Sequence, residues 1–191
     1  MQFIDLWTMA QLPQPENRLE GGCNLTGAQA CFNLVAGISV VLFRASVEAL
    51  ERRADRSDRF RDLLLGYYPF AVDDEAPAHA AELLQKAARH PLTHSLGIGK
   101  DRRCLPGAPK VEDRAVMIVK RPLSAQEASD ASRSRTRPAG WQPTIHAEGA
   151  EWIISVPTLT WGVGEMLLRL LEDEDQASAA NGVAAHLLGR N

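Results

Sequence analysis

Residues 26–44 decide the fold of this chain, and they read TGAQACFNLVAGISVVLFR. Its apolar side chains recur at the 3.6-residue period of an α-helix, at Cys31, Leu34, Val35, Ile38, Val41 and Leu42. Other apolar residues fill the opposite side, and the Thr26 hydroxyl can cap the first turn. A helix that is apolar nearly all round belongs in the middle of a bundle, and this one is too short to span a membrane. We therefore expect a buried core helix from Thr26 to about Arg44.

Two further helices are expected after this one. Residues 45–65 keep the helical period but place arginines and acids on one side, as in a helix at the surface. Asp73 or Asp74 is the expected cap of the next helix, and Pro77 lies in its first turn, where proline is tolerated. Pro91 stops or kinks that helix, because its ring removes a hydrogen-bond donor and clashes with the preceding turn.

Beyond Gly97 the pattern changes from helical to extended. Runs of β-branched and apolar residues predict strands at 115–119, 144–147 and 152–156. Residues 148–151 predict a hairpin turn between the last two strands. We expect a small antiparallel sheet in this part of the chain.

A closing helix is expected after the sheet. Its apolar spacing runs from Trp161 to Glu172, and Thr158 or Thr160 is the expected cap. The Ala-rich segment 177–191 predicts a weak helix or a tail. The predicted fold class is therefore α+β, with an N-terminal helical bundle, a small antiparallel sheet and a closing helix.

Composition is typical of a globular protein. Of the 191 residues, 45% are hydrophobic and 24% are charged, and the formal net charge of -3 is too small to attract nucleic acid or a membrane as a whole. The first twelve residues lack the basic region of a secretory signal. We expect an N-terminal segment and linker over 1–23, a helical domain over 24–100, and the sheet with its closing helix and tail over 101–191.

The cysteines indicate a reducing compartment. Cys23, Cys31 and Cys104 are odd in number, and no two of them form a C-x-x-C pair. No cluster of His, Asp and Glu has the spacing of metal ligands. We expect neither a disulfide framework nor a metal, no cofactor, and a cytoplasmic location.

One short stretch carries residue types suited to catalysis. Arg89 precedes His94 by five residues across the kink expected at Pro91, so both side chains can converge on one phosphate. Histidine titrates near neutral pH and can serve as a general acid or base. Arginine stays charged and offers a planar fork to phosphate oxygens. These are the groups that cleavage of an RNA phosphodiester requires.

With His90 directly after the arginine, the Arg89-x4-His94 pattern resembles the R-x4-6-H motif of the HEPN superfamily. The resemblance covers roughly residues 24–100. It implies an all-helical bundle of the kind found in prokaryotic toxins, phage-defence systems and RNA-processing enzymes, many of them metal-independent ribonucleases. It also implies a homodimer in which two motifs form one composite site. The implied site residues are Arg89 on phosphate, His94 as acid and base, and His90 as an auxiliary polar group.

Basic residues gather around this pair. From Lys86 to Arg121 the chain has nine basic and three acidic residues, a local excess of six positive charges. Clustered lysine and arginine bind RNA by releasing the counterions of its phosphates. The expected RNA-binding residues are Lys86, Lys100, Arg102 and Arg103.

A basic loop at 132–138 is a further expectation. Its sequence suggests a mobile segment, and Arg133, Arg135 and Arg137 with nearby Trp141 could add phosphate contacts and a stacking face. A short helix is expected just before it, because Ser124 and Glu127 form a capping box.

Other interpretations remain open. Arg89 near a helix C-terminus is favourable on its own, and His94 could be a core or capping residue. The chain would then be a non-catalytic helical scaffold that dimerises or binds a partner protein. A nucleotide-modifying enzyme is a third interpretation, but the glycines at 97–99 lack the remaining residues of a phosphate loop.

Overall fold

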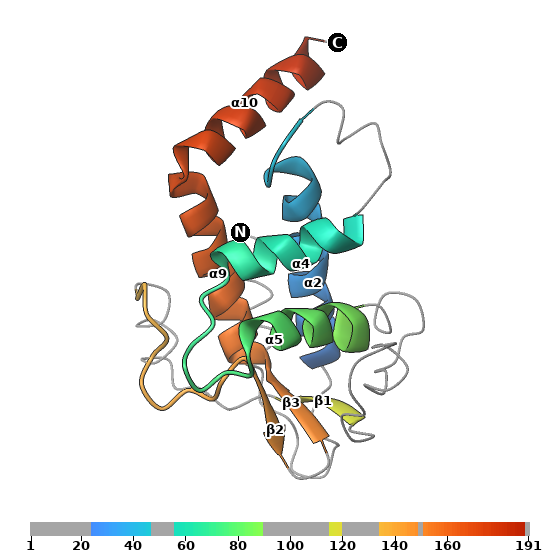
Figure 1. Cartoon of the computed structure of the whole chain (residues 1–191), viewed down its shortest axis with the longest axis vertical. Helices are drawn as coiled ribbons and strands as arrows, with labels where there is room; N and C mark the ends of the chain where they lie inside the picture. Colours follow the sequence, from blue (N-terminus) through green and yellow to red (C-terminus); the bar gives the residue numbers. More distant parts are fainter. Residues whose placement is uncertain (1–23, 47–55, 90–114, 120–133, 149–150, 190–191) are drawn as a thin grey trace.

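The computed structural model describes residues 24–46, 56–89, 115–119, 134–148 and 151–189. Within them the elements follow in this order: α2 (Asn24–Val41), α4 (Arg56–Tyr67), α5 (Pro77–Leu83), η1 (Leu84–Arg89), β1 (Ala115–Val119), β2 (Ile145–Glu148), β3 (Glu151–Ser155), α9 (Val156–Glu172) and α10 (Glu174–Leu188). The helices α2, α4, α5 and α9 form the body, the sheet lies at one end of it, and α10 projects at the other (Figure 1). The expected mixture of helices with a small sheet is confirmed.

The core lies where α2, α4 and α9 meet. Phe32 of α2, Phe60 and Leu63 of α4, and Met166 and Leu170 of α9 are all essentially inaccessible to solvent. Burying one such side chain stabilises the fold by about 1.5–3 kcal/mol, so this cluster accounts for the association of the three helices.

The first long helix is present, but it does not lie in the middle of the bundle. One side of α2 packs against α9 and α4, whereas Leu34 and Val41 on the other side are 36% and 46% exposed. Its uncharged sequence therefore predicted the helix correctly and its complete burial wrongly. Each helix of this small body has only a few neighbours, so an outer side remains.

Arg59 of α4 caps the end of α2. Its Nε donates to the Ser39 carbonyl at 2.8 Å, and its Nη2 donates to the carbonyls of Phe43 and Arg44. Arg44 itself has a φ of +47°, the left-handed conformation that commonly ends helices. One guanidinium therefore satisfies carbonyls that the end of a helix leaves without partners.

The third helix starts at Pro77 as predicted, but neither aspartate caps it. Ala76 is the N-cap residue and makes no side-chain cap bond. Asp74 instead accepts hydrogen bonds from the backbone N–H of Ala71 at 2.7 Å and of Ile145 at 3.3 Å. It therefore joins the α4–α5 connection to the sheet, a role that depends on a residue 71 positions away.

The sheet has the strand order β1-β3-β2. Strands β2 and β3 form the predicted antiparallel hairpin, with Ile145 opposite Ile154. Strand β1 runs parallel to β3, with Val116 opposite Trp152, so the expectation of a purely antiparallel sheet is wrong. The 31 residues between β1 and β3, which include β2, are long enough for the crossover that a parallel pair requires.

The closing helix begins earlier than expected. Ser155, the last residue of β3, is the N-cap of α9, and its side chain accepts from the Thr158 backbone N–H. The expected caps Thr158 and Thr160 lie inside the helix and are buried. Asp173 caps α10 in the same way through the Gln176 N–H. Every helix in the described residues is too short or too polar to cross a bilayer.

Candidate functional site

The structure describes only part of the predicted catalytic stretch. Arg89 is the last residue of η1, and nothing is described of its side chain. Apart from Lys86, the other predicted site residues lie outside the described residues, as does the capping box at 124–127; they are His90, His94, Lys100, Arg102 and Arg103. The pairing of Arg89 with His94 therefore stays a prediction.

Arg89 ends a π-helical turn. The six residues Leu84–Arg89 continue α5 with the wider π geometry. Such turns are rare and occur frequently at functional sites, because they shift the side chains that follow them. The predicted phosphate-binding arginine is thus the last residue of an unusual backbone segment.

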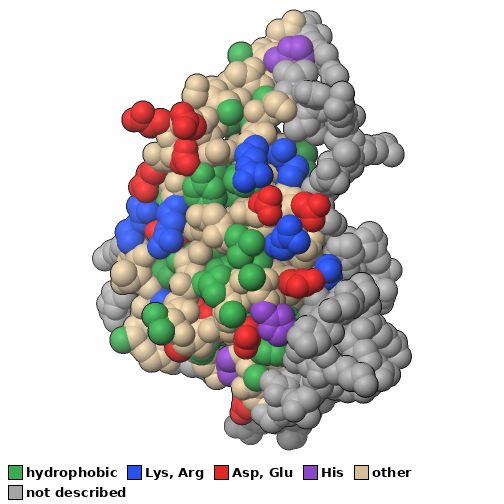
Figure 2. All heavy atoms as spheres, viewed as in Figure 1, with side chains coloured by type: hydrophobic (Ala, Val, Ile, Leu, Met, Phe, Trp, Pro, Cys, Tyr) green, Lys and Arg blue, Asp and Glu red, His purple; other side chains and the backbone are tan. Residues whose placement is uncertain are grey.

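Lys86 is the one predicted RNA-binding residue whose side chain is described. Its Nζ donates to Glu82 Oε1 at 2.6 Å, one helical turn earlier. This ion pair offsets its charge in the free protein. On the face that carries α4 and α5, basic and acidic side chains are interspersed (Figure 2). The described part of this face therefore shows no broad basic surface.

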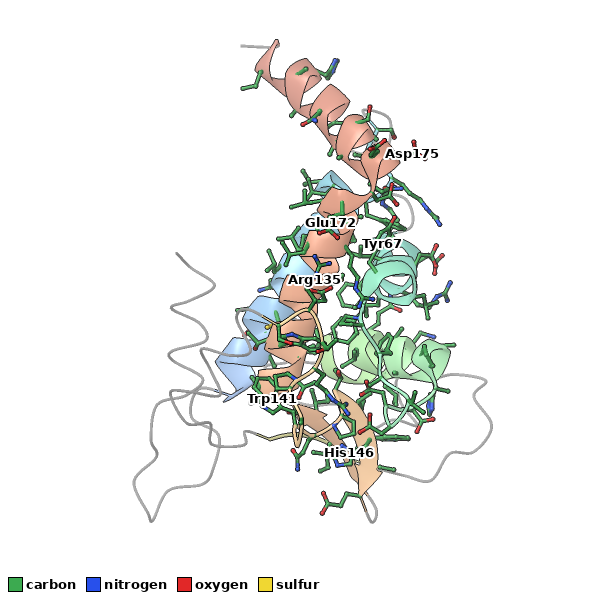
Figure 3. All side chains as sticks on the ribbon, turned by 90° about the vertical axis from the view of Figure 1, so that its left-hand side faces the viewer. Tyr67, Arg135, Trp141, His146, Glu172 and Asp175 are labelled. Carbon is green, nitrogen blue, oxygen red and sulfur yellow. The ribbon has the colours of Figure 1, made fainter. Side chains whose placement is uncertain are left out.

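The segment 134–137 is fastened to α9, which overturns the expectation of a mobile loop. Arg135 donates through Nε to Glu165 at 2.9 Å and through Nη1 and Nη2 to Glu172 at 2.6 and 3.0 Å. In Figure 3, Arg135 lies against α9 with Glu172 beside it. The Trp161 indole N–H also donates to the Ser134 carbonyl at 3.1 Å. Two carboxylates and an indole on one rigid helix therefore hold this segment.

Arg137 fastens the other end of this segment to the α4–α5 connection. Its Nη2 lies 2.6 Å from both carboxylate oxygens of Asp73. The hydrogen bond from Arg137 lowers the pKa of Asp73. Nη1 of Arg137 is buried and has no hydrogen-bond partner among the described residues. Trp141, expected as a stacking face, is only 4% exposed and belongs to the buried residues instead.

These contacts border an open cleft of about 330 Å³. Most of its apolar lining comes from α4, the α4–α5 connection and the start of α5, and its arginines come from the 134–137 segment and α9. The lining residues include Leu65, Pro69, Phe70, Pro77, Arg135, Arg137, Trp161 and Arg169. No acidic residue lines the cleft among those that the structure describes. We call it the arginine cleft.

The acids of this region pair with the three arginines but do not line the cleft. Glu165 is 3% exposed and accepts from both Arg135 and Arg169, at 2.9 and 3.0 Å. Hydrogen bonding to Arg135 lowers the pKa of Glu172 and raises that of Arg135 itself. The carboxylates thus hold the guanidinium groups in place while the arginines line the cleft.

Two histidines lie near the sheet, and both make structural contacts. His79 Nδ1 is 3.4 Å from Glu75, and its ring packs edge-on against Trp152. His146 Nε2 is 3.9 Å from Glu148. The other ring nitrogen of each is buried without a hydrogen-bond partner in the described part of the chain. Among the described residues, no three His, Cys, Asp or Glu side chains gather as ligands for a metal ion.

The sequence did contain a signal for the arginine cleft. Glu165, Arg169 and Glu172 recur at helical spacing on one side of an otherwise apolar helix. That spacing predicts a charged stripe on the helix, which needs another segment of the chain to pair with its charges. Which segment supplies the partner depends on tertiary structure.

Comparison of the chain with protein-family models, with curated proteins and with solved structures found no match.

Proposed function

We propose that this chain binds RNA and cleaves it without a metal ion, through Arg89 and His94 at a homodimer interface. The observation that carries the proposal is the Arg-x4-His pattern at the exit of a helical body, with Arg89 as the last residue of a π-helical turn. The local excess of basic residues from Lys86 to Arg121 supports RNA as the substrate.

Each residue has a distinct role in the proposed reaction. His94 takes the proton from the ribose 2′-OH and returns a proton to the leaving 5′-oxygen, or shares these steps with its dimer partner. Arg89 stabilises the negative charge that develops on phosphorus, and His90 assists as a polar group. The 2′-oxygen replaces the 5′-oxygen on phosphorus, so the product ends in a 2′,3′-cyclic phosphate.

Binding along the RNA backbone is assigned to Lys86, Lys100, Arg102 and Arg103. Lys86 forms an ion pair with Glu82 in the free protein, so its contribution requires an exchange of partners. Counterion release makes such binding weaker as the salt concentration rises.

The test is cleavage of a labelled RNA by the wild type, Arg89→Ala and His94→Ala, with and without EDTA. His94→Ala should lower the cleavage rate by about 10²- to 10⁴-fold and leave RNA binding nearly unchanged. Arg89→Ala should weaken both binding and cleavage. His186→Ala, on an exposed position of α10, is the matched control and should behave as wild type. A wild-type protein that never cleaves RNA, or activity that survives in His94→Ala, would refute the proposal.

A second candidate function is a non-catalytic scaffold that dimerises, and one observation favours it. The 18 residues of α2 include no charged side chain, yet Leu34 and Val41 are exposed. On the neighbouring helix α9, Leu168 and Leu171 are 48% and 51% exposed. The two helices meet where Cys31 Sγ lies 3.6 Å from Thr160 Oγ1. We propose a second copy of this chain as the partner, because two such apolar faces can cover each other symmetrically.

A further inference from the structure

We infer that the arginine cleft binds a nucleoside phosphate, with the phosphate on the arginines and the flat base on the apolar side. The cleft is separate from Arg89. Pro77 lines the cleft and starts α5, whereas Arg89 ends η1 twelve residues later. The two residues therefore lie at opposite ends of the helical segment formed by α5 and η1. The inference therefore does not depend on the proposed ribonuclease activity.

The polar side of the cleft is built for an anion. Arg135, Arg137 and Arg169 all line it, and the carboxylates that hold them do not. Glu165 and Glu172 orient Arg135 from α9, and Asp73 orients Arg137 from the α4–α5 connection. Guanidinium groups fixed in this way lose little entropy when they bind, and their planar forks match phosphate oxygens.

Donors remain available in this arrangement. Arg169 uses only its Nε within the described residues, to Glu165, so both of its Nη atoms remain available there. Arg137 Nη1 is buried and has no hydrogen-bond partner in the same part of the chain. A buried donor without a partner is costly, so Arg137 would gain a hydrogen bond by turning Nη1 toward a phosphate bound in the cleft.

The apolar lining of the cleft suits a flat ring. Leu65, Pro69, Phe70 and Pro77 line it. The Phe70 ring packs against Tyr68 with centroids 4.6 Å apart, and Tyr68 is itself buried, so the Phe70 ring is held from behind. A supported aromatic ring beside prolines is a suitable surface for stacking a base. The volume of about 330 Å³ is at the lower end of the range for small-molecule sites, which fits one nucleotide.

The experiment is calorimetric titration of the full chain with AMP, and with adenosine and inorganic phosphate as the two halves of that ligand. AMP should bind more tightly than either half, because only AMP contacts both sides of the cleft. Arg169→Gln should weaken AMP binding by about tenfold or more, the usual effect of losing a charged hydrogen bond. Arg61→Gln is the matched control, since Arg61 is a similarly exposed, ion-paired arginine on α4 that does not line the cleft.

A second titration, with a short oligoadenylate, distinguishes a free nucleotide from a nucleotide within an RNA strand. If Arg169→Gln weakens the binding of both AMP and the oligomer, the cleft holds one nucleotide of an RNA strand. If only AMP binding responds, the ligand is a free nucleotide. His94→Ala should bind AMP as the wild type does, whatever its effect on cleavage. AMP that fails to bind at millimolar concentration, or that binds Arg169→Gln as tightly as the wild type, would overturn the inference.

Discussion

The ring of Tyr68 lies directly against the backbone of α9 at Gly162. A Cβ atom at Gly162 would overlap both Cζ and Oη of Tyr68, because it would lie closer to them than real contacts allow. The Tyr68 hydroxyl lies 2.9 Å from the Thr144 hydroxyl in a buried environment. Through these two contacts, Tyr68 joins the end of α4 to the segment before β2 and to the first half of α9. Residue 162 must therefore be glycine because of packing and not because of its backbone conformation.

Gly162→Ala should therefore destabilise the protein. Overpacking a core typically costs about 1–3 kcal/mol, and displacing Tyr68 would also break its buried hydrogen bond to Thr144. The free energy of unfolding, measured by urea denaturation, should fall by that amount. Gly182→Ala on α10 is the control, because a Cβ atom added at Gly182 would meet no described atom within 4 Å. There the better helix propensity of alanine should raise stability by about 0.5–1 kcal/mol.

Both tyrosines of the chain should resist ionisation. Partial burial, together with the hydrogen bond to Asp173, raises the pKa of Tyr67 to about 12, and burial raises that of Tyr68 well above its usual value. The chain has only these two tyrosines, so tyrosinate absorbance should stay absent at pH 10 while the protein is folded. A tyrosine titration with an apparent pKa near 10 in the folded protein would contradict the burial of Tyr67 and Tyr68 described above.

The raised pKa of Tyr67 also predicts a loss of stability at high pH. Its folded-state pKa lies above the unfolded value of about 10, so the contribution is fully present below pH 10 and is lost as the pH rises toward 12. Tyr67→Phe cannot ionise and should reduce this dependence in melts recorded across that range. An unchanged pH dependence in the variant would assign the effect to other groups.

Glu165→Gln should release the 134–137 segment. The neutral amide cannot pair with both Arg135 and Arg169, so the segment loses its buried anchor while the exposed Glu172 remains. Hydrogen exchange at the amides of 134–137 should accelerate, and the unfolding midpoint should fall. Glu172→Gln removes the exposed partner of Arg135 and should have the smaller effect on both. Equal exchange in wild type and Glu165→Gln would show that Glu172 and Trp161 hold the segment without Glu165.

The exposed apolar residues of α2 and α9 predict a dimer that one charge can disrupt. Leu171→Glu should shift the protein from dimer to monomer in light scattering at micromolar concentration, because burying an unpaired carboxylate in an apolar interface is unfavourable. Val72→Glu is the control, since Val72 is fully exposed on the α4–α5 connection. A wild-type monomer under these conditions would refute both the scaffold and the composite ribonuclease site.

Local sequence was sufficient for most of the secondary structure. The uncharged run that forms α2, the start of α5 at Pro77 and the β2–β3 hairpin were all predicted from periodicity and turn residues. These features depend on neighbours a few positions away in the chain. The errors concern partners: the parallel direction of β1, the exposed side of α2, and the cap of α9.

For the candidate sites, local sequence and tertiary structure contribute different information. The order of residues along the chain is enough to show the Arg89-x4-His94 pattern and the charged stripe on α9. Packing of the helices is what brings Arg135 and Arg137 against acids 30 and 64 positions away, at the edge of a cleft. A run of alternating serine and arginine contains no regularly spaced apolar residues, so its sequence is typical of a mobile loop. Its order arises from charged hydrogen bonds to carboxylates that are near in space only after α9 has packed against α2 and α4.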